Sequence, residues 1–89
     1  MREDRVPEFL LRDVKKVRDA TLRRRIAEAI EQVEAAERLE QIPGITRMSG
    51  ESRLFRIRVG DSRLGLAVVD DTATFVRCLH RREIYRYFP

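Results

Sequence analysis

Three consecutive stretches in the second half of the chain alternate between apolar and polar side chains with a period of two. They are Leu54–Val59, Arg63–Val69 and Thr74–His80, and two short turn sequences, Gly60-Asp61 and Asp70-Asp71, separate them. A period of two places successive side chains on opposite faces of a strand. The pattern therefore predicts antiparallel strands joined by tight turns, with one face buried and the other exposed.

The two faces of this predicted sheet differ in chemistry. The apolar face carries Phe55, Ile57 and Val59 from the first strand and Leu64, Leu66 and Val68 from the second. The opposite face carries Arg56, Arg58 and Arg63, beside the small residues Gly65 and Ala67. We therefore expect the core on the first face and an arginine surface with little bulk around it on the second.

The N-terminal half of the chain shows helical rather than strand periodicity. Leu10, Val14 and Val17 recur at helical spacing. Pro7 suits the first turn of a helix, because its missing N–H group needs no partner there. We therefore predict a first helix over Glu8–Arg18.

A second helical stripe follows a short break in the chain. It consists of Leu22, Ile26, Ala29, Ile30, Val33 and Ala36. Thr21 is a suitable N-cap, and Pro43-Gly44 predicts a loop, so this helix is expected to fade by Glu40. Its first turn contains Arg23-Arg24-Arg25, where the helix dipole disfavours cations. These arginines form either a solvated face or a contact for a phosphate or an acidic partner.

Together these elements predict a single α+β domain over residues 1–89. Two N-terminal helices form a hairpin packed on a three- to four-stranded antiparallel sheet, to which Ile45–Ser49 adds a first short strand. Arg81–Arg86 is expected to form a short C-terminal helical turn. A chain this short buries about 60–65% of its unfolded surface, so the core is expected to be modest.

The distribution of charge indicates an anionic partner. The formal net charge is +4, and the basic residues after residue 50 are all arginine. The planar guanidinium group of arginine binds phosphate through two parallel hydrogen bonds. These arginines therefore favour nucleic acid as the partner. The alternative is that they keep a small sheet soluble and its edges unpaired.

The cysteine and histidine content limits the chemistry of the chain. Cys78 is the single cysteine, so no internal disulfide is possible, and its alternating apolar setting predicts a place in the core. One cysteine and one histidine do not make a transition-metal site of the usual composition. The longest apolar run, Leu64–Val69, is too short to span a membrane, and the charged N-terminus has no signal-peptide pattern. We expect a cytoplasmic protein without a membrane segment.

Two segments in combination point to a known family. They are Phe55–Leu64, which reads FRIRVGDSRL, and His80–Arg86, which reads HRREIYR. With the two N-terminal helices and the loop Ile42-Pro43-Gly44, they resemble the RelE/ParE superfamily of type II toxin–antitoxin toxins from about Phe9 onward. The RelE-like branch, which we favour, implies a toxin that enters the ribosomal A site and cuts mRNA without a metal or organic cofactor.

The resemblance also implies the site residues and the partners. The catalytic residues are expected to be Arg56, Arg58, Arg63, His80, Arg81 and Tyr85. The RNA-binding residues are expected to be Arg56, Arg58, Arg63, Arg77, Arg82 and Arg86. The arginines would stabilise the phosphorane, His80 would transfer a proton, and Tyr85 would stack on or orient a nucleotide. A cognate antitoxin is expected to wrap and block the toxin, in an assembly that can be of higher order.

Three departures from the family pattern leave other functions open. Ser62 stands where the family often has an aromatic residue, and Leu64–Ala67 lacks the tyrosine often found in that strand. Met1–Val6 looks too short and too charged for the usual N-terminal edge strand. A ParE-like gyrase inhibitor shares the fold without nuclease residues, and an inactive nucleic-acid-binding or antitoxin-sequestering relative is the other alternative. The arginine face with His80 and Tyr85 favours the ribosome-dependent mRNA endonuclease.

Overall fold

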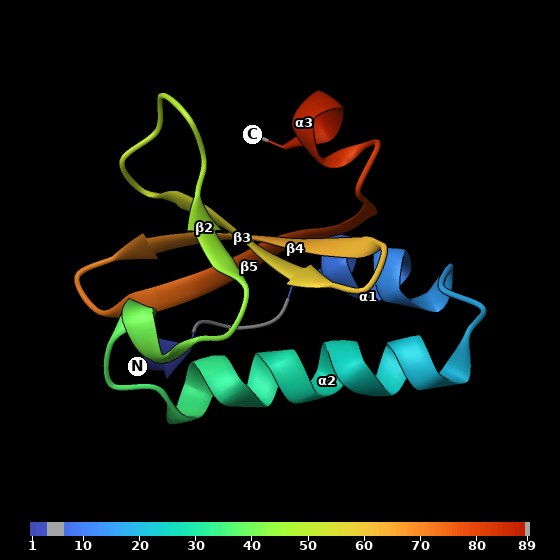
Figure 1. Ribbon diagram of the computed structural model, residues 1–89, viewed down its shortest axis with the longest axis horizontal. Helices are drawn as coiled ribbons and strands as arrows, with labels where there is room; N and C mark the ends of the chain where they lie inside the picture. The colour runs from blue at the N-terminus through green and yellow to red at the C-terminus, as the bar shows by residue number, and fades with distance from the viewer. Residues whose placement is uncertain (4–6, 89) are drawn as a thin grey trace.

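In the computed structural model, which describes residues 1–3 and 7–88, one sheet has helices on both faces (Figure 1). Two helices, α1 (Glu8–Lys15) and α2 (Ala20–Ala35), cover one face, and the short α3 (Ile84–Tyr87) lies over the other. The strands are β1 (Arg2–Glu3), β2 (Ile45–Arg47), β3 (Leu54–Val59), β4 (Ser62–Val69) and β5 (Thr72–His80). Across the sheet they follow the order β1-β5-β4-β3-β2, so the predicted α+β arrangement is confirmed.

The strands β2 to β5 form the predicted antiparallel sheet with small differences in length. β3 matches its predicted bounds, β4 begins at Ser62 rather than Arg63, and β5 begins at Thr72 rather than Thr74. The turn between β4 and β5 is Asp70-Asp71, as predicted, and both residues have the positive φ angles, 48° and 63°, of a tight hairpin turn. The alternation of the sequence therefore located these strands correctly.

The expectation that the N-terminus forms no good edge strand is corrected for its first residues. β1 pairs with β5 in parallel, with Arg2 opposite Thr72. These bonds join backbone groups, so the charge of the segment does not prevent them. The Met1 ammonium group also donates to the carbonyl oxygen of Ala36 at the end of α2, where the helix dipole favours a cation. The remainder of Met1–Val6, residues 4–6, lies outside the described residues.

Both long helices end earlier than predicted, and the second begins at a different N-cap residue from the one that the sequence suggested. The first helix stops three residues before Arg18, and the second is followed by a short 3-10 helix, Leu39–Gln41. The N-cap of α2 is Asp19 rather than the predicted Thr21. The Asp19 carboxylate accepts hydrogen bonds from the backbone N–H groups of Thr21 and Leu22 at 2.9 and 3.2 Å. An aspartate also places a negative charge at the positive end of the helix.

The main core lies between the sheet and the helices α1 and α2. As predicted, its strand residues include Phe55, Ile57, Val59, Leu64 and Leu66, all buried, with Val68 partly buried against them. Helix α1 packs on β5 and α2 packs on β3. Cys78 is also buried in this core, as predicted, and burial raises the pKa of its thiol to about 12. The thiol is therefore neutral at physiological pH and is a poor nucleophile.

A smaller apolar cluster lies on the opposite face of the sheet, beneath α3. It consists of Met48, Leu79, Ile84 and Phe88. The Phe88 ring packs directly on the backbone of Gly65, because a methyl group placed on that glycine would lie 2.8 Å from the ring. The predicted helical turn, Arg81–Arg86, is a turn followed by α3. The small residues on this face therefore provide the space in which the C-terminal segment packs.

Candidate nucleic-acid interface

Four arginine side chains gather on the face of the sheet that carries α3. Arg56 and Arg58 come from β3, Arg63 comes from β4, and Arg81 follows β5; we call these four residues the arginine cluster. In the register of the sheet Arg58 lies directly opposite Arg63, and Arg56 lies opposite Gly65. Like charges placed opposite each other on antiparallel strands lower stability. The cluster therefore costs folding energy and favours the binding of an anion.

Arg63 is at the centre of this electrostatic strain. Burial lowers the pKa of its guanidinium group, and the nearby Arg56, Arg58 and Arg81 lower that pKa further. Its Nη1 donates to the carbonyl oxygens of Gly60 and Ser62 at 2.8 and 2.9 Å, which fixes the side chain at the β3–β4 turn. Its buried Nε has no hydrogen-bond partner among the described residues. An incoming phosphate would supply both an acceptor and a compensating charge.

Arg81 joins the cluster through the turn that follows β5. Its backbone N–H donates to the carbonyl oxygen of Asp61 at 2.8 Å, and its Nε lies 3.8 Å from the Asp61 carboxylate. Both side chains are more than half exposed, so this ion pair is weak. Asp61 raises the pKa of Arg63 but is the last and smallest of the influences on it. Asp61 therefore offsets only a small part of the positive charge around Arg63.

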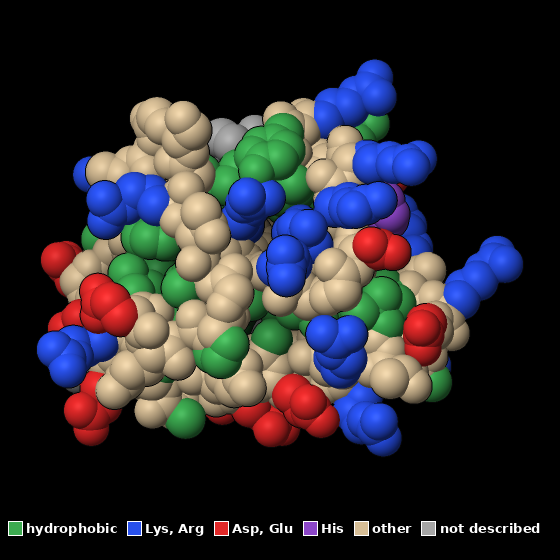
Figure 2. Space-filling view, viewed as in Figure 1, with side chains coloured by type: hydrophobic (Ala, Val, Ile, Leu, Met, Phe, Trp, Pro, Cys, Tyr) green, Lys and Arg blue, Asp and Glu red, His purple; other side chains and the backbone are tan. Residues whose placement is uncertain are grey.

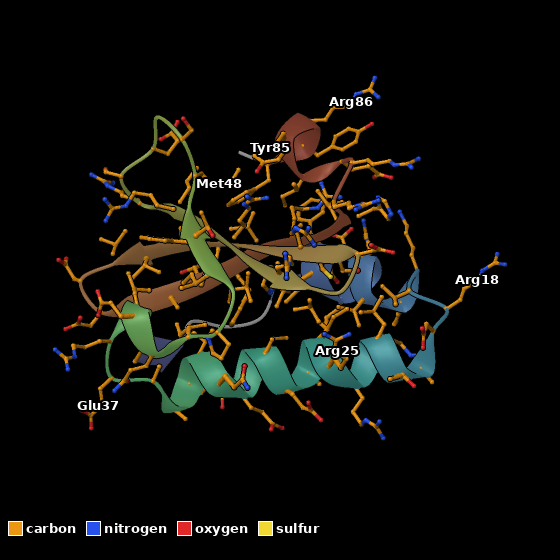
Figure 3. All side chains as sticks on the ribbon, in the orientation of Figure 1. Arg18, Arg25, Glu37, Met48, Tyr85 and Arg86 are labelled. Atoms are coloured by element: carbon orange, nitrogen blue, oxygen red, sulfur yellow. The ribbon has the colours of Figure 1, made fainter. Side chains whose placement is uncertain are left out.

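Tyr85 brings an aromatic ring from α3 to the same face. The guanidinium carbon of Arg56 lies 5.0 Å from the centre of the Tyr85 ring, at cation–π distance. The tyrosine is 62% exposed, so most of its surface is available to a ligand. Figure 3 shows Tyr85 on α3 above the sheet. The aromatic ring and the arginines together offer the two contacts that single-stranded nucleic acid uses, stacking and phosphate binding.

His80 is not brought together with the arginine cluster. It lies opposite Ser62, whereas its neighbour Leu79 lies opposite Arg63, so the side chains of His80 and Arg63 point to opposite faces of the sheet. The Nδ1 atom of His80 accepts a hydrogen bond from the backbone N–H of Arg82 at 3.1 Å. Neutral His80 therefore carries its proton on Nε2, and its acceptor nitrogen is used by the turn.

Arg77 is held by a partner that the sequence analysis did not single out. Its Nε and Nη2 donate to the two carboxylate oxygens of Asp13 at 2.7 and 3.1 Å, and this hydrogen bonding raises the pKa of Arg77. Asp13 is 5% exposed and also accepts from the backbone N–H of Cys78 at 2.9 Å. The side chain of Arg77 is thus committed to joining α1 to β5. A polar residue between Leu10 and Val14 in an apolar helix stripe is the signal in the sequence that points to Asp13.

The remaining predicted RNA-binding arginines, Arg82 and Arg86, lie at the exposed C-terminal end of the molecule. Arg86 extends into solvent (Figure 3), with its guanidinium carbon 5.7 Å from the centre of the Tyr87 ring. In Figure 2 basic side chains gather from the centre of this view to its upper right, where acidic ones also occur, and other acidic ones lie along the lower and left margins. Basic side chains on this face of the molecule therefore extend to the C-terminal segment, where Arg86 lies.

The sequence analysis did not identify Phe88 as a residue of the interface. Its ring holds α3 on the sheet at Gly65, and α3 in turn carries Tyr85. Part of the signal was present in the sequence, since a glycine inside a strand, here Gly65, often marks a place where another group packs closely on the backbone. Which residue makes that approach depends on how the C-terminal segment folds back, and no local pattern specifies it.

Two kinds of feature are missing from the part of the chain that the structure describes. None of its helices combines the length and the apolar character needed to cross a membrane. Nor do three or more His, Cys, Asp or Glu side chains meet there in a way that would hold a metal ion.

Comparisons with known proteins find one relative by sequence and one by structure. Over 69 residues the chain is 41% identical to Toxin RelE3 of Methanocaldococcus jannaschii, which covers 76% of this chain and 78% of that protein. The fold is also similar to a chain in the crystal structure of a RelB–RelE antitoxin–toxin complex from Methanococcus jannaschii. That match has a TM-score of 0.77 and 34% sequence identity, and it covers 100% of both chains. No protein-family model matches the sequence.

Proposed function

This chain belongs to the RelE family, the toxins of RelB–RelE toxin–antitoxin systems, and from that premise we propose that it is a ribosome-dependent mRNA endonuclease. In this proposal it inhibits translation by cutting mRNA without a metal. The observation that carries the proposal is the arginine cluster: four guanidinium groups lie together, and among the described residues Asp61 is the one carboxylate that acts on the pKa of Arg63 at its centre. Such a site is suited to a phosphodiester whose charge grows during the reaction.

The proposed chemistry uses the 2′-hydroxyl group of the RNA as the nucleophile. Its oxygen forms a bond to the adjacent phosphorus, and the bond from phosphorus to the 5′-oxygen breaks. The 2′-hydroxyl gives its proton to a solvent water, and the leaving 5′-oxygen takes a proton from solvent, so that the products are a 2′,3′-cyclic phosphate and a 5′-hydroxyl. Arg58 and Arg63, opposite each other on β3 and β4, would bind the non-bridging oxygens. Tyr85 would stack on a base and hold the scissile phosphate over the cluster.

Proton transfer by His80 stays a prediction and has no support in this geometry. The imidazole points to the other face of the sheet, and its acceptor nitrogen binds the backbone of Arg82. We therefore assign the main catalytic contribution to the arginine cluster. Electrostatic stabilisation of this kind is commonly the largest single term in catalysis.

We also propose a cognate antitoxin as the partner of this chain, and the cytoplasm as the place where both act. The relative of known structure is a chain of a RelB–RelE antitoxin–toxin complex. Helix α1 of this chain exposes Phe9 and Leu11, which are 62% and 51% exposed. Two such apolar side chains on one short helix suit an amphipathic partner segment that folds on binding. Higher-order antitoxin–toxin assemblies are part of the same proposal.

Primer-extension mapping of transcripts after induced expression tests the proposed activity. We expect cuts within translated regions, in phase with codons, and we expect them to disappear in the Arg56→Ala/Arg58→Ala double variant. Arg18→Ala is the matched control, because Arg18 extends away from the molecule far from the cluster (Figure 3). DNA damage without RNA cuts would favour a gyrase inhibitor instead. Growth with neither effect would favour an inactive relative, and either result would overturn the proposal.

A further inference from the structure

A groove of about 670 Å³ lies beside the arginine cluster, between α2 and the β3–β4 turn. It shares Arg58, Arg63 and Arg81 with the cluster and adds Arg25 from α2. Its carboxylates come from Glu28 and Asp61, so four guanidinium groups face two carboxylates. The excess of positive charge and the polar lining suit an anionic ligand.

Arg25 is directed into this groove by its place on the helix. It precedes the buried Ile26 and lies one turn before the buried Ala29, so it leaves the helix near the face that packs on the sheet. Its Nη1 atom approaches the turn closely, since a methyl group built on Gly60 would lie 3.4 Å from it. Figure 3 places Arg25 on α2 below the β3–β4 turn. Because Gly60 has no side chain, the groove is open to the backbone of the turn.

The three consecutive arginines of α2 have different surroundings. Arg23 donates to the carbonyl oxygen of Val17 at 2.6 Å and ties the connection between the helices. Arg24 is exposed and lines none of the grooves described for this molecule. Arg25 lines the groove, and within the described ranges it forms no ion pair with a carboxylate. The third arginine of the run is therefore the one whose charge is placed for a ligand.

We propose that this groove binds the RNA backbone phosphate that neighbours the scissile one, and that Arg25 is its main ligand. The inference rests on the proposed function, because it takes the arginine cluster as the place of the scissile phosphate. Three of the four cluster residues line the groove as well, so guanidinium groups form an unbroken path from Tyr85 to Arg25. A continuous path of this kind fits a polyanionic strand with regularly spaced phosphates better than an isolated carboxylate.

Binding of uncleavable RNA by the purified protein tests the groove directly. Two RNA oligonucleotides carry a 2′-deoxy sugar at the cleavage position, which prevents cleavage. The short oligonucleotide contains only the two nucleotides joined by the scissile phosphate, and the long one has three more nucleotides on each side. Affinity is measured by fluorescence anisotropy between 50 and 200 mM salt. We expect Arg25→Gln to lower the affinity for the long oligonucleotide by about threefold or more. The slope of log affinity against log salt concentration should become shallower by about 0.7. The short oligonucleotide should bind both proteins equally.

Arg24→Gln is the matched control, since it removes the same charge from the neighbouring position of the same helix. Equal effects of Arg24→Gln and Arg25→Gln would show a general charge effect and would overturn the groove as a site. Loss of binding of a glutamate-rich peptide in Arg25→Gln, with RNA binding unchanged, would assign the groove to an acidic protein segment instead. No binding of either oligonucleotide by the wild-type protein would also overturn the proposal.

The groove and the proposed activity can fail separately. If wild-type protein cuts mRNA while Arg25→Gln and Arg24→Gln bind the long oligonucleotide equally, the groove proposal alone is wrong. If wild-type protein cuts no mRNA yet binds the long oligonucleotide through Arg25, the groove stands as an RNA phosphate site and the proposed nuclease activity is wrong.

Discussion

Arg56 and Arg77 lie directly opposite Gly65 on the two strands that flank β4, yet their side chains have different roles. Arg56 lies over the ring of Tyr85, and its neighbours in the arginine cluster are cations. Arg77 reaches the edge of the sheet and is bound through two hydrogen bonds to the buried Asp13. In the sequence both are polar residues within alternating strands, Arg56 on β3 and Arg77 on β5. The difference shows that a buried carboxylate, rather than strand position, decides whether an arginine is structural or free to bind a ligand.

This contrast predicts opposite consequences for the same kind of substitution. Removing Arg77 leaves the Asp13 carboxylate buried without its partner, which is costly. Removing Arg56 or Arg58 relieves repulsion between cations, which costs the fold little. The first change should therefore lower stability and the second should lower activity.

The largest expected effect is the loss of stability when Arg77, the structural arginine of the two, is removed. Arg77→Ala should lower the free energy of unfolding by about 3–5 kcal/mol, because it leaves a buried charge uncompensated. Thermal or urea unfolding of the purified protein measures the loss. Arg82→Ala, an exposed arginine two residues beyond β5, serves as the control and should leave stability within about 0.5 kcal/mol. If the Arg77→Ala protein were as stable as the wild type, the conclusion that Arg77 is structural and Arg56 is not would be wrong.

The next largest effect concerns the arginine cluster. Arg56→Ala and Arg58→Ala should each reduce the single-turnover rate of mRNA cleavage by about 10²–10³, the usual loss for one electrostatic donor in a transition state. Their unfolding midpoints should stay at or slightly above that of the wild type. Lysine at either position should recover part of the rate, since it restores the charge but not the planar fork. Full cleavage by both alanine variants would place the RNA site elsewhere.

Gly65 lies between the two arginines and allows a more selective perturbation. Gly65→Ala should displace the Phe88 ring, which packs where the new methyl group would lie, at a cost of about 1–3 kcal/mol. Because Phe88 holds α3, the displacement should also move Tyr85 and slow cleavage, while the Arg77–Asp13 pair stays intact. The double variant Gly65→Ala/Phe88→Leu, with a smaller side chain at the contact, should recover stability and rate. No recovery would mean that the two residues act independently.

The smallest effect is expected at His80. His80→Ala removes the hydrogen bond to the backbone of Arg82, worth about 0.5–1.5 kcal/mol in a typical turn. The cleavage rate per folded molecule should change by a few-fold at most. Measuring the melting temperature and the single-turnover rate on the same variant separates the two roles. A stable variant whose rate falls by about 10²–10⁴ would instead make His80 a proton-transfer residue.

The local patterns of the sequence were sufficient for the three long strands to within two residues, for the turns between them and for the strand side chains of the main core. Leu54–Val59 has its predicted bounds, and Asp70-Asp71 is the predicted turn, because period-two alternation and turn propensity act between residues close in the chain. The same alternation placed Arg56, Arg58 and Arg63 on one face. These features needed no knowledge of how the helices pack.

Only the tertiary structure decided which of the arginines are free and what each one faces. Arg77 meets Asp13 across 64 residues of sequence, Arg25 reaches the turn at Gly60, and Phe88 folds back over Gly65. Such contacts depend on how whole elements pack against one another. A one-residue step along a strand also reverses the face of a side chain, and this step separates His80 from the arginine cluster. The charge of a residue and its place in a periodic pattern can be read from the nearby sequence. Whether an opposite charge lies next to it depends on which parts of the chain meet in the folded protein.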